Sequence, residues 1–448
     1  MFATIIRQDL RLLSRDGLAL AVLAALLAAL VFAVMSAREI AGAHAAGLAQ
    51  EEARIWQRQA ELEEPVGPTQ IRRPATLEPS PLSVLSLGRT RLDPAQAEVS
   101  FFSRLDLMFR DYQIASPFAL RAGAFDLSFV VIVIAPLLMI ALGAGMVLSD
   151  RDSARLRMMM ASPASPATIL LARSLLRASI VVVPVFAAAI IAAHLSDRAP
   201  PLADLALWTG GALIYLALWQ GLIAFANTLR VRADAASVGL IAVWAIWIFL
   251  IPAVTSATAA ALHPPPSRAG LVADLRAAEA RGRESAPEDL IRFMHDHPEL
   301  QAQGDADIAD WMRSNAMIRM RVEAALRDPA QEFETALQSQ DAIARLAEFA
   351  TPALAANRAL ADAAGTGEAR HRAFRRQAQA FKADLQGMLT DAALSARSLT
   401  RADADAAARF AMDESAVPRN ASSMWFWLAI AALLFAWTAR RASRITPI

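Results

Sequence analysis

Residues 18–35 read LALAVLAALLAALVFAVM and contain no charged side chain. A helix needs about 20 apolar residues to cross the hydrocarbon core of a bilayer. Similar runs recur along the chain, and they predict transmembrane helices at 17–36, 127–148, 169–195, 202–229, 238–255 and 423–439. The sequence therefore predicts an all-α polytopic membrane protein with about six transmembrane helices.

The composition is that of a chain in lipid, and it excludes several classes of function. Of the 448 residues, 56% are hydrophobic and 19% are charged, and the mean hydropathy is +0.36. The formal net charge of +1 provides no concentrated basic surface, so we expect no nucleic-acid partner. Cysteine is absent, which excludes disulfides and zinc–thiolate sites. Lys382 is the only lysine and follows Phe381, so the chain lacks the Gly-Lys of a phosphate-binding ATPase loop and is not expected to be an enzyme.

The positions of the arginines predict which side of the membrane each loop faces, since positive residues remain on the cytoplasmic side. They precede the first predicted span, join the second to the third and the fourth to the fifth, and follow the sixth: Arg7, Arg11, Arg15, Arg151, Arg155, Arg157, Arg230, Arg232, Arg440, Arg441 and Arg444. This pattern predicts cytoplasmic termini, with a tail at 440–448, and extracytoplasmic inserts at 37–126 and 256–422 in a bacterial inner membrane. A cleavable signal peptide is the alternative for the first span, although its apolar run is longer than is typical of one.

The two inserts are predicted to be mostly helical. A polar helix is expected at 40–64, before prolines at 65, 68, 74, 79 and 81 break the chain into an irregular segment. In the second insert, Ser285 with Glu288 and Thr400 with Asp403 have the spacing of helix starts. Longer helices are expected at 330–364, with an interruption near Pro352, and at 367–397. The sequence thus predicts a helical extracytoplasmic domain.

Two cytoplasmic segments have distinctive patterns. Residues 1–16 predict an interfacial helix on the membrane surface, because Arg7 and Arg11 lie opposite an apolar face. The loop at 149–168 contains DRDSARLRMMMASP at 150–163, which combines charges, a methionine run and a Ser-Pro pair. A docking element for a partner is one interpretation of this pattern, but the composition alone favours an ordinary charged connector that follows the positive-inside rule.

Several segments resemble the ABC-2 class of ABC-transporter permeases. They are GAFDLSF at 123–129, APLL at 135–138, LSDRD at 148–152, MMMASP at 158–163, ATPAL at 350–354 and AGTGEARHRAF at 364–374. Within the class, the chain is most similar to an uncharacterised subfamily with large extracytoplasmic inserts. The resemblance implies a permease subunit that forms a dimer with itself or with a paralogue and binds a separate ATP-binding subunit.

The resemblance also implies a role for the loop after the second span. In such permeases this loop is a coupling helix that sits in a groove of the ATPase subunit. The family's Glu-x-Glu pair corresponds to Asp150 and Asp152, its Gly-Thr pair to Ala154 and Arg155, and a lysine of the third span to Arg173. The implied coupling residues are Asp150, Arg151, Asp152, Arg155, Met158, Met159, Ser162 and Pro163. ATP and Mg²⁺ are then expected on the partner subunit, and no cofactor is expected in this chain.

Polar residues elsewhere give two further predictions. Tyr215 and Gln220, in the fourth span, face either a translocation path or a neighbouring helix to which they hydrogen-bond. The outer histidines, which are His263, His295, His297 and His371, lack the spacing of converging ligands, so no metal site is expected.

Two hypotheses of function follow. The first is a permease that exports a substrate or transmits ATP-driven motion across the membrane. The alternative is a non-transporting scaffold or mechanotransmitter that recruits a periplasmic or envelope partner through its outer helical domain.

Overall fold

The computed structural model describes residues 2–63, 66–90, 92–103, 125–152, 165–301, 310–395, 399–406, 409–418 and 422–442. Within these ranges, six helical segments are long and apolar enough to cross a membrane. They are α2 (Gly17–Ala60), the segment Leu127–Arg151, α8 (Pro166–His194), α9 (Leu202–Ala226), the segment Ala233–Leu262 and α18 (Ser422–Ala442). The chain is an all-α multi-pass membrane protein, as the hydropathy pattern predicts.

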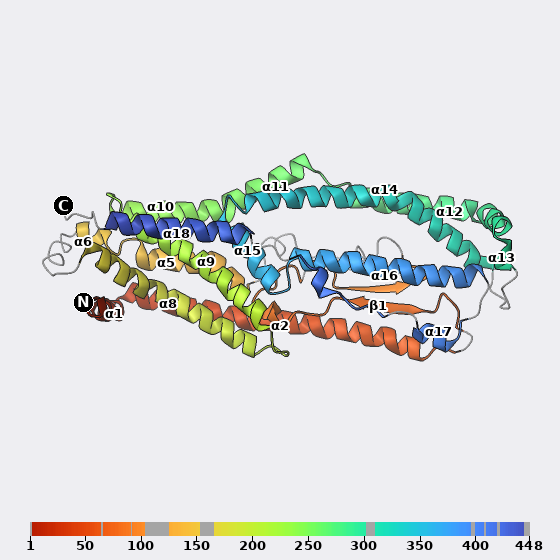
Figure 1. Cartoon of the computed structure of the whole chain (residues 1–448), viewed down its shortest axis with the longest axis horizontal. Coiled ribbons are helices and arrows are strands. Elements are labelled where there is room, and N and C mark those ends of the chain that lie inside the picture. The colour runs from red at the N-terminus through yellow and green to blue at the C-terminus, as the bar shows by residue number, and fades with distance from the viewer. Residues whose placement is uncertain are drawn as a thin grey trace.

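The molecule is elongated, with the apolar bundle at one end and the two inserts at the other (Figure 1). Helix α1 (Phe2–Leu13), helix α6 (Leu148–Asp152) and the end of α18 all lie at the bundle end. We call this the basal end, and we call the parts of the inserts beyond the bundle the distal domain. An even number of crossings places α1 and the end of α18 on one side, and in Figure 1 both lie at the same end of the molecule.

Helix α9 lies at the centre of the bundle. It contacts α5 (Ala135–Gly143), α8 and α18, and it buries Trp208, Tyr215 and Trp219 almost completely. The span formed by α10 (Ala233–Ala245) and α11 (Ile251–Leu262) is mostly exposed by comparison. Large apolar side chains on this exposed span, such as Val238 and Phe249, suit contact with lipid.

Helix α2 does not end at the membrane surface. Its 44 residues form one continuous helix, whereas the sequence suggested a span at 17–36 and a separate helix at 40–64. Asp16 caps its start by accepting a hydrogen bond from the amide of Leu18 at 3.0 Å. Beyond the bundle, the helix packs against strand β1, so that one element joins the bundle to the distal domain.

The distal domain contains two short strands that were not predicted. Strand β1 (Arg72–Thr76) pairs in antiparallel fashion with β2 (Gln96–Ser100), in the proline-rich region that was expected to be irregular. Pro74 is tolerated because each strand of a two-stranded sheet has a free edge, where a backbone donor is not needed. A short 3₁₀ helix, η1 (Pro81–Val84), follows β1.

The second insert forms a helical arm and a helical layer on the sheet. The arm consists of α12 (Arg268–Asp296), α13 (Pro298–Gln301) and α14 (Asp310–Ala347). Helices α15 (Pro352–Ala363) and α16 (Glu368–Leu394) follow, and then α17 (Arg401–Ala406) and the 3₁₀ helix η5 (Glu414–Ala416). The inner face of α16 packs on the sheet and on the end of the arm, with Phe374 and Leu389 fully buried.

The two predicted helix starts in this insert have different outcomes. Ser285 lies inside α12, which begins instead after Ser267, whose hydroxyl accepts a hydrogen bond from the amide of Gly270. The start at Thr400 is confirmed, because Thr400 and Asp403 exchange side-chain and backbone hydrogen bonds at the beginning of α17.

Candidate functional site

A cluster of buried charges lies at the basal end, between α1, α6 and α8. Arg173 of α8 pairs with Asp150 of α6 and donates to the carbonyl of Met146 at 2.7 Å. Its Nε atom also lies 3.5 Å from Asp9 of α1. Arg173 is only 8% exposed, so its charge is neutralised by these carboxylates and not by water.

Arg177, one helical turn further along α8, belongs to the same cluster. Its Nε atom lies 3.3 Å from Asp9, and it donates to the carbonyl of Leu142. Asp9 is 2% exposed and therefore lies between two guanidinium groups. Both arginine side chains thus point into the protein, toward carboxylates of other helices. We call Asp9, Asp150, Arg173 and Arg177 the basal cluster.

Helix α6 is also attached to the connection between α9 and α10. Arg151 donates to the carbonyls of Leu229 and Val231 at 2.8 and 2.7 Å. Asn227 accepts a hydrogen bond from the amide of Val147 at 2.9 Å and donates to the carbonyl of Gly143 at 2.9 Å. Helix α6 and the residues just before it are therefore bonded to α8 and to the connection between α9 and α10.

Of the predicted coupling residues, the first three, Asp150, Arg151 and Asp152, lie within the described part of the chain. Asp150 and Arg151 lie on α6 with the partners given above, and Asp152 ends that helix. Arg155, Met158, Met159, Ser162 and Pro163 lie outside the described residues.

Sequence reasoning missed Asp9 and Asn227. Asp9 could have been noticed because it lies four residues before Leu13, so that the two side chains share one face of the helix. This is the face that α1 buries against α8.

Tyr215 and Gln220, the two candidates for a translocation path, hydrogen-bond within the bundle. The Tyr215 hydroxyl donates to the carbonyl of Ile132 at 2.8 Å, and Gln220 donates to the hydroxyl of Ser174 at 2.5 Å. Their exposed fractions are 1% and 8%. These contacts are the interhelical bonds considered as the alternative, and a role in a translocation path stays a prediction.

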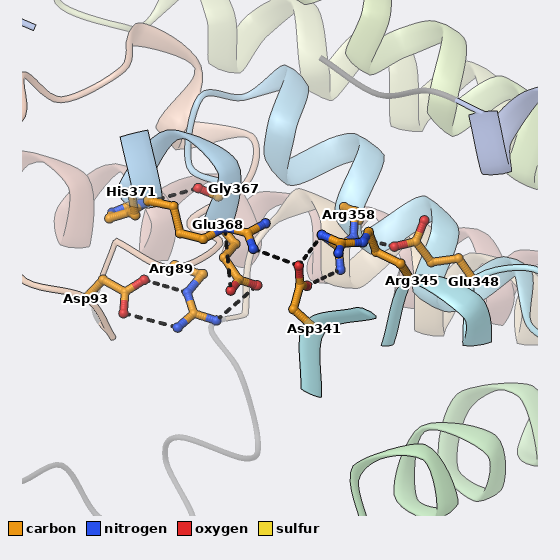
Figure 2. Close-up of polar contacts among 10 residues, drawn as sticks. Arg89, Asp93, Asp341, Arg345, Glu348, Arg358, Gly367, Glu368 and His371 are labelled. Carbon is orange, nitrogen blue, oxygen red and sulfur yellow. Dashed lines mark hydrogen bonds and ion pairs between the residues drawn. The ribbon is translucent and has the colours of Figure 1, made fainter. Parts of the chain in front are cut away.

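A second charged cluster joins the bundle to the distal domain (Figure 2). Three arginines converge on Asp341 near the end of α14: Arg345 at 2.5 Å, Arg372 of α16 at 2.8 Å and Arg358 of α15 at 2.9 Å. Arg358 also pairs with Glu348. Burial alone would raise the pKa of Asp341, but the hydrogen bond and charge of Arg358, together with Arg372, hold that pKa below its ordinary value.

The same cluster extends to the first insert. Arg372 lies 4.0 Å from Glu368, which in turn lies 3.7 Å from Arg89. Arg89 pairs with Asp93 at 2.5 Å (Figure 2). Residues more than 250 positions apart are thus joined by one series of ion pairs. We call Arg89, Asp93, Asp341, Glu348, Arg358, Glu368 and Arg372 the junction cluster.

The histidines do not form a site. His371 is buried next to the junction cluster, with Nδ1 3.1 Å from the carbonyl of Gly367, and burial lowers its pKa. His295 and His297 are on the surface beside Asp296 and Glu299. Among the described residues, no three His, Asp or Glu side chains converge in a way that could hold a metal ion.

Comparison with protein families gives a match within the second insert. Residues 269–413 match a family model described as a domain of unknown function, DUF3526. The match begins in α12 and ends before α18, so it includes most of the junction cluster and none of the basal cluster. No curated protein and no solved structure matches the chain.

Proposed function

We propose that the chain is the permease subunit of an ABC-2 type ATP-driven transporter in a bacterial inner membrane. One observation carries the proposal: α6, which begins the predicted docking loop, is joined by buried ion pairs and hydrogen bonds to α1, α8 and the α9–α10 connection. A loop that only connected two spans would need no such attachment.

The basal cluster joins the second span to α8 and to the surface helix α1. Arg173 bonds the end of the second span, through Asp150 and Met146, and also Asp9 of the surface helix α1. Breaking a buried ion pair on one side costs about 3–5 kcal/mol, so a displacement of α6 is passed on and not absorbed. The partner is an ATP-binding subunit that carries ATP and Mg²⁺, and the active form is a dimer of this chain or a pair with a paralogue.

The movement would either export a substrate or act on the distal domain. The junction cluster supports the second outcome, because it connects α14, α15 and α16 at the place where they meet the bundle. This observation favours, as the alternative function, a mechanotransmitter that engages an envelope partner without transport. Uptake of labelled compounds by inverted vesicles, in the presence of the ATPase subunit, separates the two hypotheses.

The test is purification of the tagged full chain from its native membrane, followed by measurement of bound ATPase. We expect an ATP-binding subunit to co-purify and its activity to depend on the loop. Replacing Asp152 and Arg155 by Ala should abolish stimulation of the ATPase while membrane insertion stays normal. Arg232→Ala is the matched control, since that side chain is exposed. Absence of any ATP-binding subunit from the intact complex would overturn the proposal.

A further inference from the structure

Two spans contain the same rare backbone feature at related positions. The π-helical segment η3 (Val130–Ile134) lies in the second span and η4 (Ile246–Leu250) lies in the fifth. Each has five residues, and each is followed by one residue and then a proline, Pro136 or Pro252. A proline has no amide to donate and clashes with the preceding turn, so each segment is a point where the regular helix is interrupted and can bend. We call these two points the bends.

Two backbone carbonyls of η3 accept hydrogen bonds from side chains of other spans. Pro136 cannot bond the carbonyl of Ile132, four residues earlier, and this oxygen accepts instead from the Tyr215 hydroxyl at 2.8 Å. The next carbonyl, of Val133, accepts from the indole of Trp244 in α10 at 3.1 Å. The bend in the second span is therefore held by residues of the fourth and fifth spans.

The bend in the fifth span is held from outside the bundle. The carbonyl of Trp247, five residues before Pro252, accepts from the hydroxyl of Thr351 at 3.0 Å. Thr351 is completely buried, and its hydroxyl also accepts from the amide of Ala353 to cap α15. A single hydroxyl thus bonds both the bend and the first turn of α15.

Helix α15 connects both bends to the junction cluster. It contacts η3 and η4 as well as α9, and its Arg358 pairs with Asp341 and Glu348. Trp427 of α18 adds a bond from its indole to the carbonyl of Glu348 at 2.8 Å.

We propose that η3 and η4 are paired hinges in the second and fifth spans, and that Thr351 is the latch that couples the hinge of the fifth span to the distal domain. Bending at η4 then moves α15, and α15 moves the junction cluster through Arg358. Release of the Thr351 bond would let the outer part of the fifth span move independently of α15. This inference does not depend on an ATPase partner, and it can be tested on the isolated chain.

The test uses the full chain in lipid nanodiscs, without nucleotide or partner. The chain has no cysteine, so spin labels at Ile191→Cys and Leu262→Cys report only the distance between the ends of α8 and α11 that lie toward the distal domain. Both positions are exposed. Hydrogen exchange of the α11 amides is the second readout.

Thr351→Val preserves shape and removes the hydroxyl. We expect a broader distance distribution and about fivefold faster exchange in the first turn of α11, as loss of one hydrogen bond implies. Thr351→Ser should restore both, and Pro252→Ala should narrow the distribution by allowing a regular helix. Thr335→Val is the control, because its hydroxyl bonds only the carbonyl of Gln331 within its own exposed helix.

An unchanged distribution in folded Thr351→Val, or a Thr351→Ser variant as broad as Thr351→Val, overturns the latch. A distance distribution in Pro252→Ala that is as broad as in the native chain overturns the hinge. If Thr351→Val does not fold, Tyr215→Phe tests the hinge in the second span. Amide hydrogen exchange in α5 should then be faster than in the native chain. Exchange that is no faster overturns the proposal of paired hinges.

Discussion

At the scale of single residues, the most consequential observation is that Arg173 neutralises two carboxylates in a place that water does not reach. Asp9 lies 168 positions from Arg177, and Asp150 lies 23 positions from Arg173. Asp9, Asp150 and Arg173 are nevertheless buried together, and Arg177 is partly buried beside them. A buried charge is tolerated only when it is paired, so each member of the basal cluster requires the others. This interdependence makes the cluster sensitive to single substitutions.

Arg173→Met should destabilise the protein strongly. The methionine removes the buried cation that pairs with Asp150 and one of the two cations beside Asp9, at a cost of about 3–5 kcal/mol. Thermal unfolding in detergent, followed by tryptophan fluorescence, measures the effect. Arg232→Met removes an ion pair that is more than 80% exposed and should change stability by less than about 0.5 kcal/mol. Equal effects of the two substitutions would contradict the importance of the buried pairing.

Asp362 of α15 should make stability depend on pH. Burial raises its pKa to about 6, and the charges of Glu348 and Glu368 add to this while Arg358 opposes it. A folded pKa above the unfolded value near 3.8 stabilises the fold below about pH 4, and this contribution is lost as the pH rises through 6. Asp362→Asn should therefore gain stability relative to the native chain between pH 4.5 and 7.5, by about 1–3 kcal/mol.

Unfolding midpoints at several pH values test this prediction. Asp234→Asn alters an exposed carboxylate and serves as the control. A difference between Asp362→Asn and the native chain that stays constant across the pH range would show that Asp362 is ionised throughout.

Some residue roles could be predicted from the sequence and others could not. The cap formed by Thr400 and Asp403 could be predicted, because it depends only on local spacing. Arg173 was matched to a family position, but its pairing with Asp9 and Asp150 was not predicted. Asp9 was missed because its partners come from a helix more than 160 residues away. Ser285 was misplaced because its capping pattern occurs within a longer helix, where tertiary packing determines the boundary.

At the scale of elements, the contact between the first insert and the α15–α16 connection requires a glycine at position 88 for steric reasons. Gly88 has a φ of 44°, and a Cβ there would lie 2.6 Å from the carbonyl oxygen of Thr366. The backbone amide of Arg89 bonds this same carbonyl at 2.9 Å. The first insert thus approaches the α15–α16 turn too closely for any side chain.

Gly88→Ala should weaken this contact by at least about 2 kcal/mol, since it adds both a left-handed backbone penalty and a clash with the Thr366 carbonyl. Gly387→Ala is the matched control, because a Cβ at this exposed position of α16 meets nothing within 4 Å and should stabilise the helix by about 0.5–1 kcal/mol. Chemical unfolding of both variants gives the comparison. A tolerated alanine at position 88 would mean that the two segments separate easily.

The types of most elements were predictable, but their interruptions were not. The helices α14, α15 and α16 follow from apolar periodicity and from Pro352. The π segments depend on donors such as Tyr215 and Trp244 that other spans supply, and β1 depends on a partner strand more than 20 residues away. Sequence patterns contain local preference and do not contain these distant partners.

At the scale of the whole molecule, the six apolar helices were predictable because transfer into a bilayer depends only on local composition. The relative placement of the bundle and the distal domain was not predictable, because α2 continues through both and α15 packs against α9.

The predicted orientation leads to a labelling experiment. A cysteine at the exposed position Gly387 of the distal domain should react with a membrane-impermeant maleimide added to intact spheroplasts. A cysteine at Arg230, exposed at the basal end, should react only after the membrane is opened. The absence of native cysteine leaves no background. Labelling of Arg230→Cys in intact cells, with protection of Gly387→Cys, would reverse the orientation.

The continuity of α2 has a geometric consequence for the whole molecule. Its 44 residues span about 66 Å at the usual rise of a helix, and its last residue, Ala60, bonds Arg401 of α17. A tilt of about 5° at the basal end would displace Ala60 by roughly 6 Å on this length. The helix thus acts as a lever, in which an angular change too small to disturb packing in the bundle becomes a displacement larger than a side chain at the far end of the protein.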